Sequence, residues 1–155
     1  MKDTGTSEPS NRGMSETHPP RRILRRIGAV LAGLLAIIIL SSVTDMALHA
    51  TGVFPPVGQA MADTLFLLAT AYRIVYAVAG SYLAAWLAPD RPMQHALALG
   101  VVGLAISTAG AVATWNAGPA FGPKWYPLVV IAIALPCAWA GGRLREMQVR
   151  SRADG

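Results

Sequence analysis

Four polar side chains lie inside otherwise apolar stretches, where they could do chemistry. Asp45 and His49 are four residues apart in SSVTDMALHA, and Arg73 and Tyr76 are three apart in TLFLLATAYRIVYAVAGSYLAAWLA. A carboxylate, an imidazole, a guanidinium and a phenol in apolar surroundings could bind a proton, an ion or a lipid headgroup. Arg73 is the most costly of the four, because a guanidinium keeps its proton and needs a partner or water.

The position of Arg73 on its helix predicts where its partner lies. At about 100° per residue, Arg73 shares a face with small residues, and such faces allow helices to approach closely in lipid. The other residues of this face are Ala69, Thr70, Ala77, Gly80 and Ala84. At ~1.5 Å per residue, Asp45 of the preceding segment comes to nearly the same depth as Arg73. We expect an Asp45–Arg73 ion pair, with His49 or Tyr76 beside it.

This polar cluster has two interpretations. The pair can simply hold two helices together, or it can line a small polar cavity that binds a proton, an ion or a headgroup. In the second case a paired Asp45 would be a poor proton carrier, and His49 would be the group that titrates near neutral pH. The sequence leaves both interpretations open.

Four apolar segments must carry these residues. Each reaches or approaches the ~20 residues that a helix needs to cross a bilayer, and none shows the alternation of a barrel strand. The pattern predicts an all-α integral membrane four-helix bundle in one domain over residues 21–146. A disordered tail is expected at 1–20 and a second tail at 147–155, and the first segment is too long for a cleaved signal peptide. The predicted spans are 27–50, 64–88, 94–115 and 125–144.

Basic residues predict the orientation of the spans. Eleven of the 13 Lys and Arg residues lie before the first span, between the second and third, or from the last two residues of the fourth span onward. With four spans these three regions share one side, and Lys124 is the one basic residue of the other side. Because basic loops stay in the cytoplasm, both termini are predicted to be cytoplasmic.

Small residues predict where the helices pack. Gly80 belongs to the small-residue face of the second segment, and Gly103, Ser107 and Gly110 form a similar series on the third. Such a series predicts a packing seam, either within the bundle or between two copies of the chain.

Several classes of function are disfavoured. The chain has no HExxH, no glycine-rich phosphate loop, no GxSxG elbow and no cluster with metal-ligand spacing. We therefore expect no catalytic residue, no metal site and no cofactor. The net charge of +5 comes from basic residues that flank apolar spans, which does not indicate nucleic-acid binding. Cys137 is the single cysteine, and its apolar surroundings predict a buried hydrophobic side chain.

Three stretches together resemble a known family. TDMALHATGVFPP, AYRIVYAVAGSYLAAWLAP and GPKWYP…CAWAGGRL look like a family of small, uncharacterised four-span bacterial inner-membrane proteins, over roughly residues 22–145. The resemblance implies a multi-pass protein of the bacterial cytoplasmic (inner) membrane, and it brings no activity or ligand. The expected partners are the lipid bilayer and a second copy or another membrane protein.

Two functions follow as predictions. The first is an accessory or structural membrane protein that binds partners or lipids through its small-residue helix faces. The alternative is a small oligomeric transporter or channel that uses Asp45, His49 and Arg73. Four helices barely enclose a pathway, so this alternative requires a dimer or a larger assembly.

Overall fold

The computed structural model describes residues 19–118 and 121–153, which form four α-helices joined by three loops. No strand occurs in these residues, so the predicted all-α class is confirmed. The helices are α1 (Pro19–Ala50), α2 (Asp63–Leu87), α3 (Pro92–Thr114) and α4 (Trp125–Ala153).

Prolines mark several helix ends. α1 begins with a Pro-Pro pair, and Pro92 opens α3, because proline has no N–H and its fixed φ suits the first helical turn. α2 ends where Ala88, the residue before Pro89, takes an extended conformation. The last turn before α3 uses Arg91 in the left-handed region, at φ 46°.

Two helices are longer than predicted. α1 begins at Pro19 rather than near Ile27, and α4 continues to Ala153 rather than ending near Leu144. The added segments, PPRRILRR and REMQVRSRA, carry many good helix formers, whereas the apolar pattern marks only the part that can cross a membrane. Residues 19 and 20, which were predicted to belong to the disordered tail, are the first two residues of α1. The rest of the predicted tail, residues 1–18, lies outside the described residues.

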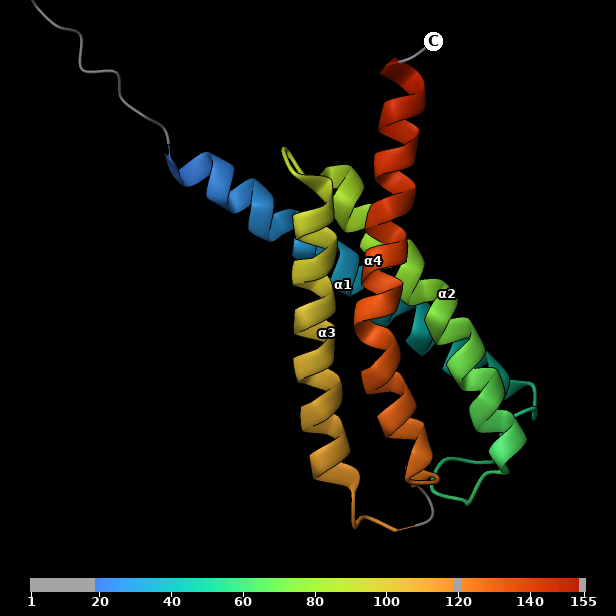
Figure 1. Cartoon of the computed structure of the whole chain (residues 1–155). Helices are drawn as coiled ribbons and strands as arrows, with labels where there is room; N and C mark the ends of the chain where they lie inside the picture. Colours follow the sequence, from blue (N-terminus) through green and yellow to red (C-terminus); the bar gives the residue numbers. More distant parts are fainter. Residues whose placement is uncertain (1–18, 119–120, 154–155) are drawn as a thin grey trace, which may run out of the picture.

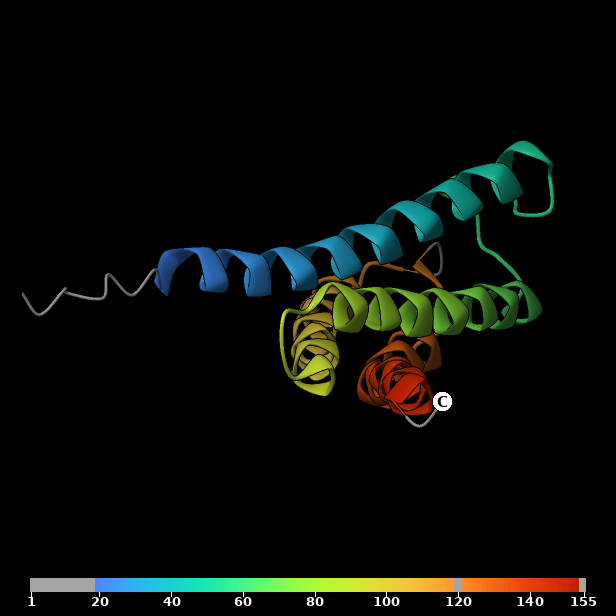
Figure 2. The same ribbon diagram turned by 90° about the horizontal axis from the view of Figure 1, so that it is seen from above.

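α2 is the centre of the assembly. It contacts α1, α3 and α4, whereas α1 packs on α2 and α3 and hardly touches α4. Figure 2 shows α1 on one side of α2 and α4 on the other. The predicted bundle is thus a group of α2, α3 and α4 with α1 laid along one side of it.

The chain runs up and down, so the helix ends gather in two regions. The start of α1, the α2–α3 turn and the end of α4 lie at the upper end in Figure 1. We call this the basic end, because Arg26, Arg91, Arg143 and Arg145 belong to it. The α1–α2 and α3–α4 loops lie at the opposite end.

All four helices are long and apolar enough to cross a membrane, by length and composition. Between 11% and 28% of the most apolar stretch of each helix is buried inside the protein, so much of the apolar surface is exposed. An exposed apolar surface of this extent suggests a membrane protein. Examples on three helices are Leu31, Ile39, Met46, Val75 and Val112.

Close helix crossings occur at glycines. A Cβ atom at Gly33 of α1 would lie 2.6 Å from the Gly80 carbonyl oxygen of α2, and one at Gly141 of α4 would lie 2.5 Å from the Val78 carbonyl oxygen. α3 meets α4 at Gly100, where a Cβ would lie 2.5 Å from the Ala138 Cβ. Backbone contacts this short are compatible only with glycine.

The predicted seam on α3 does not form within the chain. Gly80 lies at a crossing, but a Cβ at Gly103 or Gly110 would have no atom within 4 Å. Ser107, between them, is half-buried. α3 packs on α4 through Gly100 instead, and Gly103 and Gly110 face open space, which leaves the predicted seam between two copies of the chain as a prediction.

Candidate functional site

The centre of the candidate site is an ion pair between α1 and α2. Nη2 of Arg73 donates to Oδ2 of Asp45 over 2.7 Å, and the Tyr72 hydroxyl donates to Oδ1 of the same carboxylate. The exposed fractions of the Arg73 and Asp45 side chains are 30% and 32%. Two consecutive residues of α2 therefore hold both oxygens of one carboxylate on α1.

The helix geometry explains why long side chains meet here. Ala69, Thr70, Gly80 and Ala84 of the predicted face are buried, so Arg73 lies on the packed side of α2. α1 and α2 approach most closely at Gly33 and Gly80, and Asp45 and Arg73 lie farther along toward the opposite end. Away from a crossing the gap between two straight helices widens, and a guanidinium or phenol can span it.

Two of the predicted cluster members lie nearby but do not touch the pair through hydrogen bonds. The Tyr76 hydroxyl is 2.8 Å from the Thr44 hydroxyl, and the Tyr76 ring lies 5.7 Å from the Tyr72 ring. Nδ1 of His49 is 2.7 Å from the Pro55 carbonyl oxygen. His49 therefore fixes the start of the α1–α2 loop, and Tyr76 adds a second polar link between α1 and α2.

Arg73 also contacts two aromatic rings, those of Tyr72 and Tyr126, which the sequence did not indicate. The Arg73 guanidinium carbon lies 5.6 Å from the centre of the Tyr126 ring on α4 and 5.8 Å from that of Tyr72. Both distances suit a cation–π contact. The Tyr126 hydroxyl is buried and has no hydrogen-bond partner among the described residues.

Three cavities meet at Arg73. The first, which we call the inner cleft, has a volume of about 330 Å³ and is lined by residues of all four helices. The outer cavity, of about 280 Å³, lies beneath the α1–α2 loop and includes His49 and Tyr126. The side cavity, of about 310 Å³, includes Ser107, Gly110 and Tyr126. The inner cleft has apolar walls that include Leu34, Ile38, Leu99, Ile106 and Ile133.

The ion pair separates two of these cavities. Among the described residues, Asp45 and Arg73 alone line both the inner cleft and the outer cavity. The inner cleft and the side cavity share Arg73, Ser107 and Val130. The small residues of α3 make room for these cavities. Gly103 and Ser107 line the inner cleft, and Gly110 lines the side cavity.

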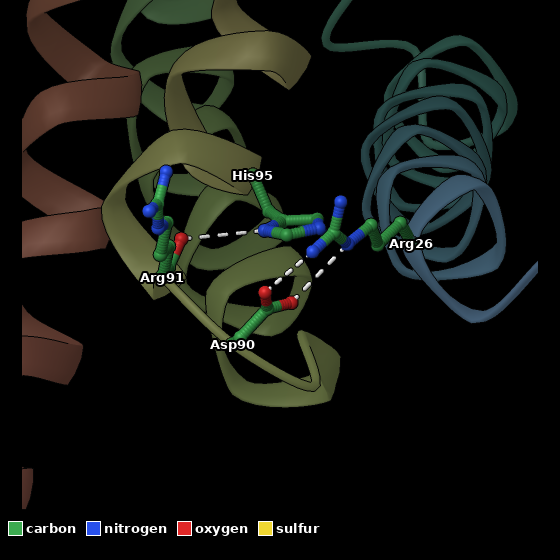
Figure 3. Close-up of polar contacts among 4 residues, drawn as sticks. All are labelled: Arg26, Asp90, Arg91 and His95. Atoms are coloured by element: carbon green, nitrogen blue, oxygen red, sulfur yellow. Dashed lines mark hydrogen bonds and ion pairs between the residues drawn. The ribbon is translucent and has the colours of Figure 1, made fainter. Parts of the chain in front are cut away.

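A second ion pair joins α1 to the α2–α3 turn at the basic end (Figure 3). Nε and Nη2 of Arg26 donate to the two carboxylate oxygens of Asp90 over 3.2 and 2.5 Å. The ring of His95 lies beside them, buried, with Nδ1 3.3 Å from the Arg91 carbonyl oxygen. These hydrogen bonds from Arg26 lower the pKa of the Asp90 carboxyl group below its ordinary value of 3.8.

Acid should remove the stabilisation by this second pair. Because the pKa of Asp90 is lower in the folded protein, the pair contributes stability above pH 3.8 and loses it as the pH falls through the folded pKa. We expect Asp90→Asn to be less stable than the unaltered protein at pH 7 and equally stable once Asp90 is protonated. Unfolding in mild detergent from pH 7 to pH 3 measures this, and a pH-independent difference would contradict it. Because the pair is exposed, added salt should shrink the difference.

Comparison with known proteins finds no match to this chain among family models, curated proteins or solved structures. The function therefore has to follow from the helices, the Asp45–Arg73 pair and the cavities around it.

Proposed function

We propose that this chain is a multi-pass protein of the bacterial cytoplasmic membrane with both termini in the cytoplasm. The four apolar helices and the exposed apolar surface support insertion. The basic end supports the orientation, because arginines near span ends stay in the cytoplasm. The opposite end carries Lys124, whose ammonium lies 5.2 Å from the Trp115 ring, and Trp125; such aromatic residues favour the membrane interface.

Reporter fusions test this topology. An alkaline phosphatase fused after Gly118 should be active, since this enzyme matures only outside the cytoplasm, whereas the same fusion after Gly155 should be inactive. Green fluorescent protein at the same positions should give the reverse pattern. Equal signals at the two positions would contradict the arrangement of four spans.

We further propose that the protein is a non-enzymatic accessory protein that binds lipid-like molecules in the inner cleft. The observation that carries this proposal is the shape of the cleft, which has apolar walls and a polar end at Asp45 and Arg73. Toward the basic end, α1, α2 and α3 pack closely where Gly33 meets Gly80 and the buried Leu99. Close packing beside one end of the cleft favours retention of a ligand over its passage.

Filling the cleft should reduce the amount of bound lipid. Gly103 lines the inner cleft and has open space beside it, so Gly103→Leu places a side chain there without a backbone clash. Gly28→Leu is the matched control, because Gly28 of α1 is equally unobstructed and does not line the cleft. We expect native mass spectrometry to detect co-purified lipid on the unaltered protein and the control but little on Gly103→Leu. Equal lipid on all three proteins would rule out the cleft.

A small oligomeric transporter or channel is the second candidate. The observation that favours it is that Asp45 and Arg73 lie between the inner cleft and the outer cavity, where a breakable pair would act as a gate. This function also needs an opening toward the basic end, where the helices pack closely. Stability of Asp45 and Arg73 variants separates the candidates, because a pair needed only for solute movement can be removed without weakening the fold.

A further inference from the structure

Arg73 has hydrogen-bonding capacity that the protein does not use. A guanidinium carries five N–H donors. Among the described residues, the hydrogen bond of Arg73 is the one from Nη2 to Asp45. Arg73 lines the inner cleft, the outer cavity and the side cavity, so its side chain adjoins open volume, and none of its other donors has a protein acceptor among the described residues. Donors in an apolar environment favour an acceptor strongly.

A second unused donor lies in the same place. The Tyr126 hydroxyl is buried without a hydrogen-bond partner in the described part of the chain, and Tyr126 lines the side cavity together with Arg73 and Ser107. A guanidinium and a serine hydroxyl at one cavity, with the unpartnered Tyr126 hydroxyl buried beside it, are complementary to an oxygen-rich group, and most strongly to an anionic one. The nearest carboxylate, Asp45, is held on the α1 side by Tyr72 and Arg73 and leaves the side cavity free.

The inner cleft is suited to the rest of such a ligand. It adjoins the side cavity at Arg73, Ser107 and Val130. At ~30 Å³ per water-sized group, its volume of about 330 Å³ matches one apolar chain of roughly eleven groups. Its walls are mostly apolar, as the site of an alkyl chain requires.

We propose that the site binds a single-chain acidic amphiphile, a long-chain carboxylate, with its carboxylate in the side cavity and its chain in the inner cleft. Arg73 binds the carboxylate through the donors that Asp45 leaves free, and the Tyr126 hydroxyl donates a further hydrogen bond. The guanidinium then lies between two carboxylates, one from the protein and one from the ligand. This assignment rests on the proposed function, because it names the ligand of the same cleft.

Binding of dodecanoate tests the assignment. The full-length protein is placed in nanodiscs of zwitterionic phospholipid, and radiolabelled dodecanoate is titrated with empty nanodiscs as the blank. Saturable binding is expected, and dodecanol, which has the same chain without the charge, should bind at least about tenfold more weakly. Equal binding of dodecanol and dodecanoate would overturn the assignment. So would displacement of dodecanoate by a small proportion of anionic phospholipid, since the occupant would then be a two-chain lipid.

Variants assign the contacts. Tyr126→Phe removes one hydroxyl and leaves the ring over Arg73, and it should weaken dodecanoate binding about tenfold without changing dodecanol binding. Arg73→Gln should abolish the preference for dodecanoate, and Arg91→Gln in the α2–α3 turn is the control that should change nothing. If Tyr126→Phe binds dodecanoate as the unaltered protein does, the assignment is wrong.

Gly103→Leu distinguishes failure of this assignment from failure of the proposed function. One outcome is that Gly103→Leu binds neither amphiphile and that the unaltered protein binds dodecanoate and dodecanol equally. This outcome would support a lipid-binding cleft and refute the carboxylate site. Unchanged binding of both amphiphiles in Gly103→Leu would refute the cleft itself.

Discussion

Gly33→Ala should destabilise the protein by about 1–3 kcal/mol, whereas Gly28→Ala on the same helix should stabilise it by about 0.5–1 kcal/mol. At Gly33 the new methyl group would lie 2.6 Å from the Gly80 carbonyl oxygen and 2.9 Å from the Ala84 Cβ, so α1 and α2 must separate. At Gly28 it would meet nothing within 4 Å, and the higher helix propensity of alanine remains as the main effect.

Both variants exchange the same residue types five positions apart on one helix, so changes in helix propensity cancel in the comparison. Reversible unfolding in mixed detergent micelles, followed by circular dichroism, gives the two free energies of unfolding. Gly80→Ala should behave like Gly33→Ala, since a methyl group there would lie 2.8 Å from the Gly33 carbonyl oxygen. If Gly33→Ala is as stable as Gly28→Ala, the close crossing of α1 and α2 does not exist.

Asp45→Asn and Arg73→Gln should each destabilise the protein, and the double variant should be less affected than the sum of the two. Asp45→Asn leaves the Arg73 guanidinium in apolar surroundings without a counter-charge, which costs about 2–3 kcal/mol. The cost stays below that of a fully buried pair because about a third of each side chain is exposed. With both charges removed no uncompensated charge remains, so we expect a coupling free energy of about 1 kcal/mol or more.

The same unfolding measurement decides between the two candidate functions. A coupling near zero, with both single variants as stable as the unaltered protein, would mean that the pair does not hold α1 to α2. The transporter would then be the stronger candidate. A large coupling supports the accessory protein. Arg143→Gln is the matched control, because the Arg143–Glu146 pair lies within α4 at the exposed basic end and should contribute little.

Periodicity and scarcity of charge made part of this structure predictable. A helix repeats every 3.6 residues, so the small residues around Arg73 could be placed on one face before any neighbour was known. Charged residues are so rare in the apolar segments that Asp45 was the predicted partner of Arg73. A hairpin of the first two helices was expected to place the two residues at similar depth. The structure places both residues in contact.

Other features depend on how helices cross, which periodicity does not determine. Gly33 and Gly103 look alike in the sequence, yet one lies at a crossing and the other faces the inner cleft. Tyr72 and Tyr126 were not singled out because nothing in their spacing indicates which helix they meet. His49 was expected beside the ion pair, but its imidazole forms a hydrogen bond with the Pro55 carbonyl oxygen in the loop. Predicting these contacts would require the crossing angles of α1 with α2 and α3 and of α2 with α4.

The three attachments of α1 have a mechanical consequence. Arg26 binds Asp90 at the basic end, Gly33 meets Gly80 at the crossing, and Asp45 binds Arg73 near the opposite end. At ~1.5 Å per residue the two outer contacts lie about 10 and 18 Å from the crossing. A stiff helix held at an intermediate point is a lever with unequal arms. A swing that draws Asp45 3 Å from Arg73 moves Arg26 by a little under 2 Å in the opposite direction, so a displacement at the opposite end strains the Arg26–Asp90 contact at the basic end.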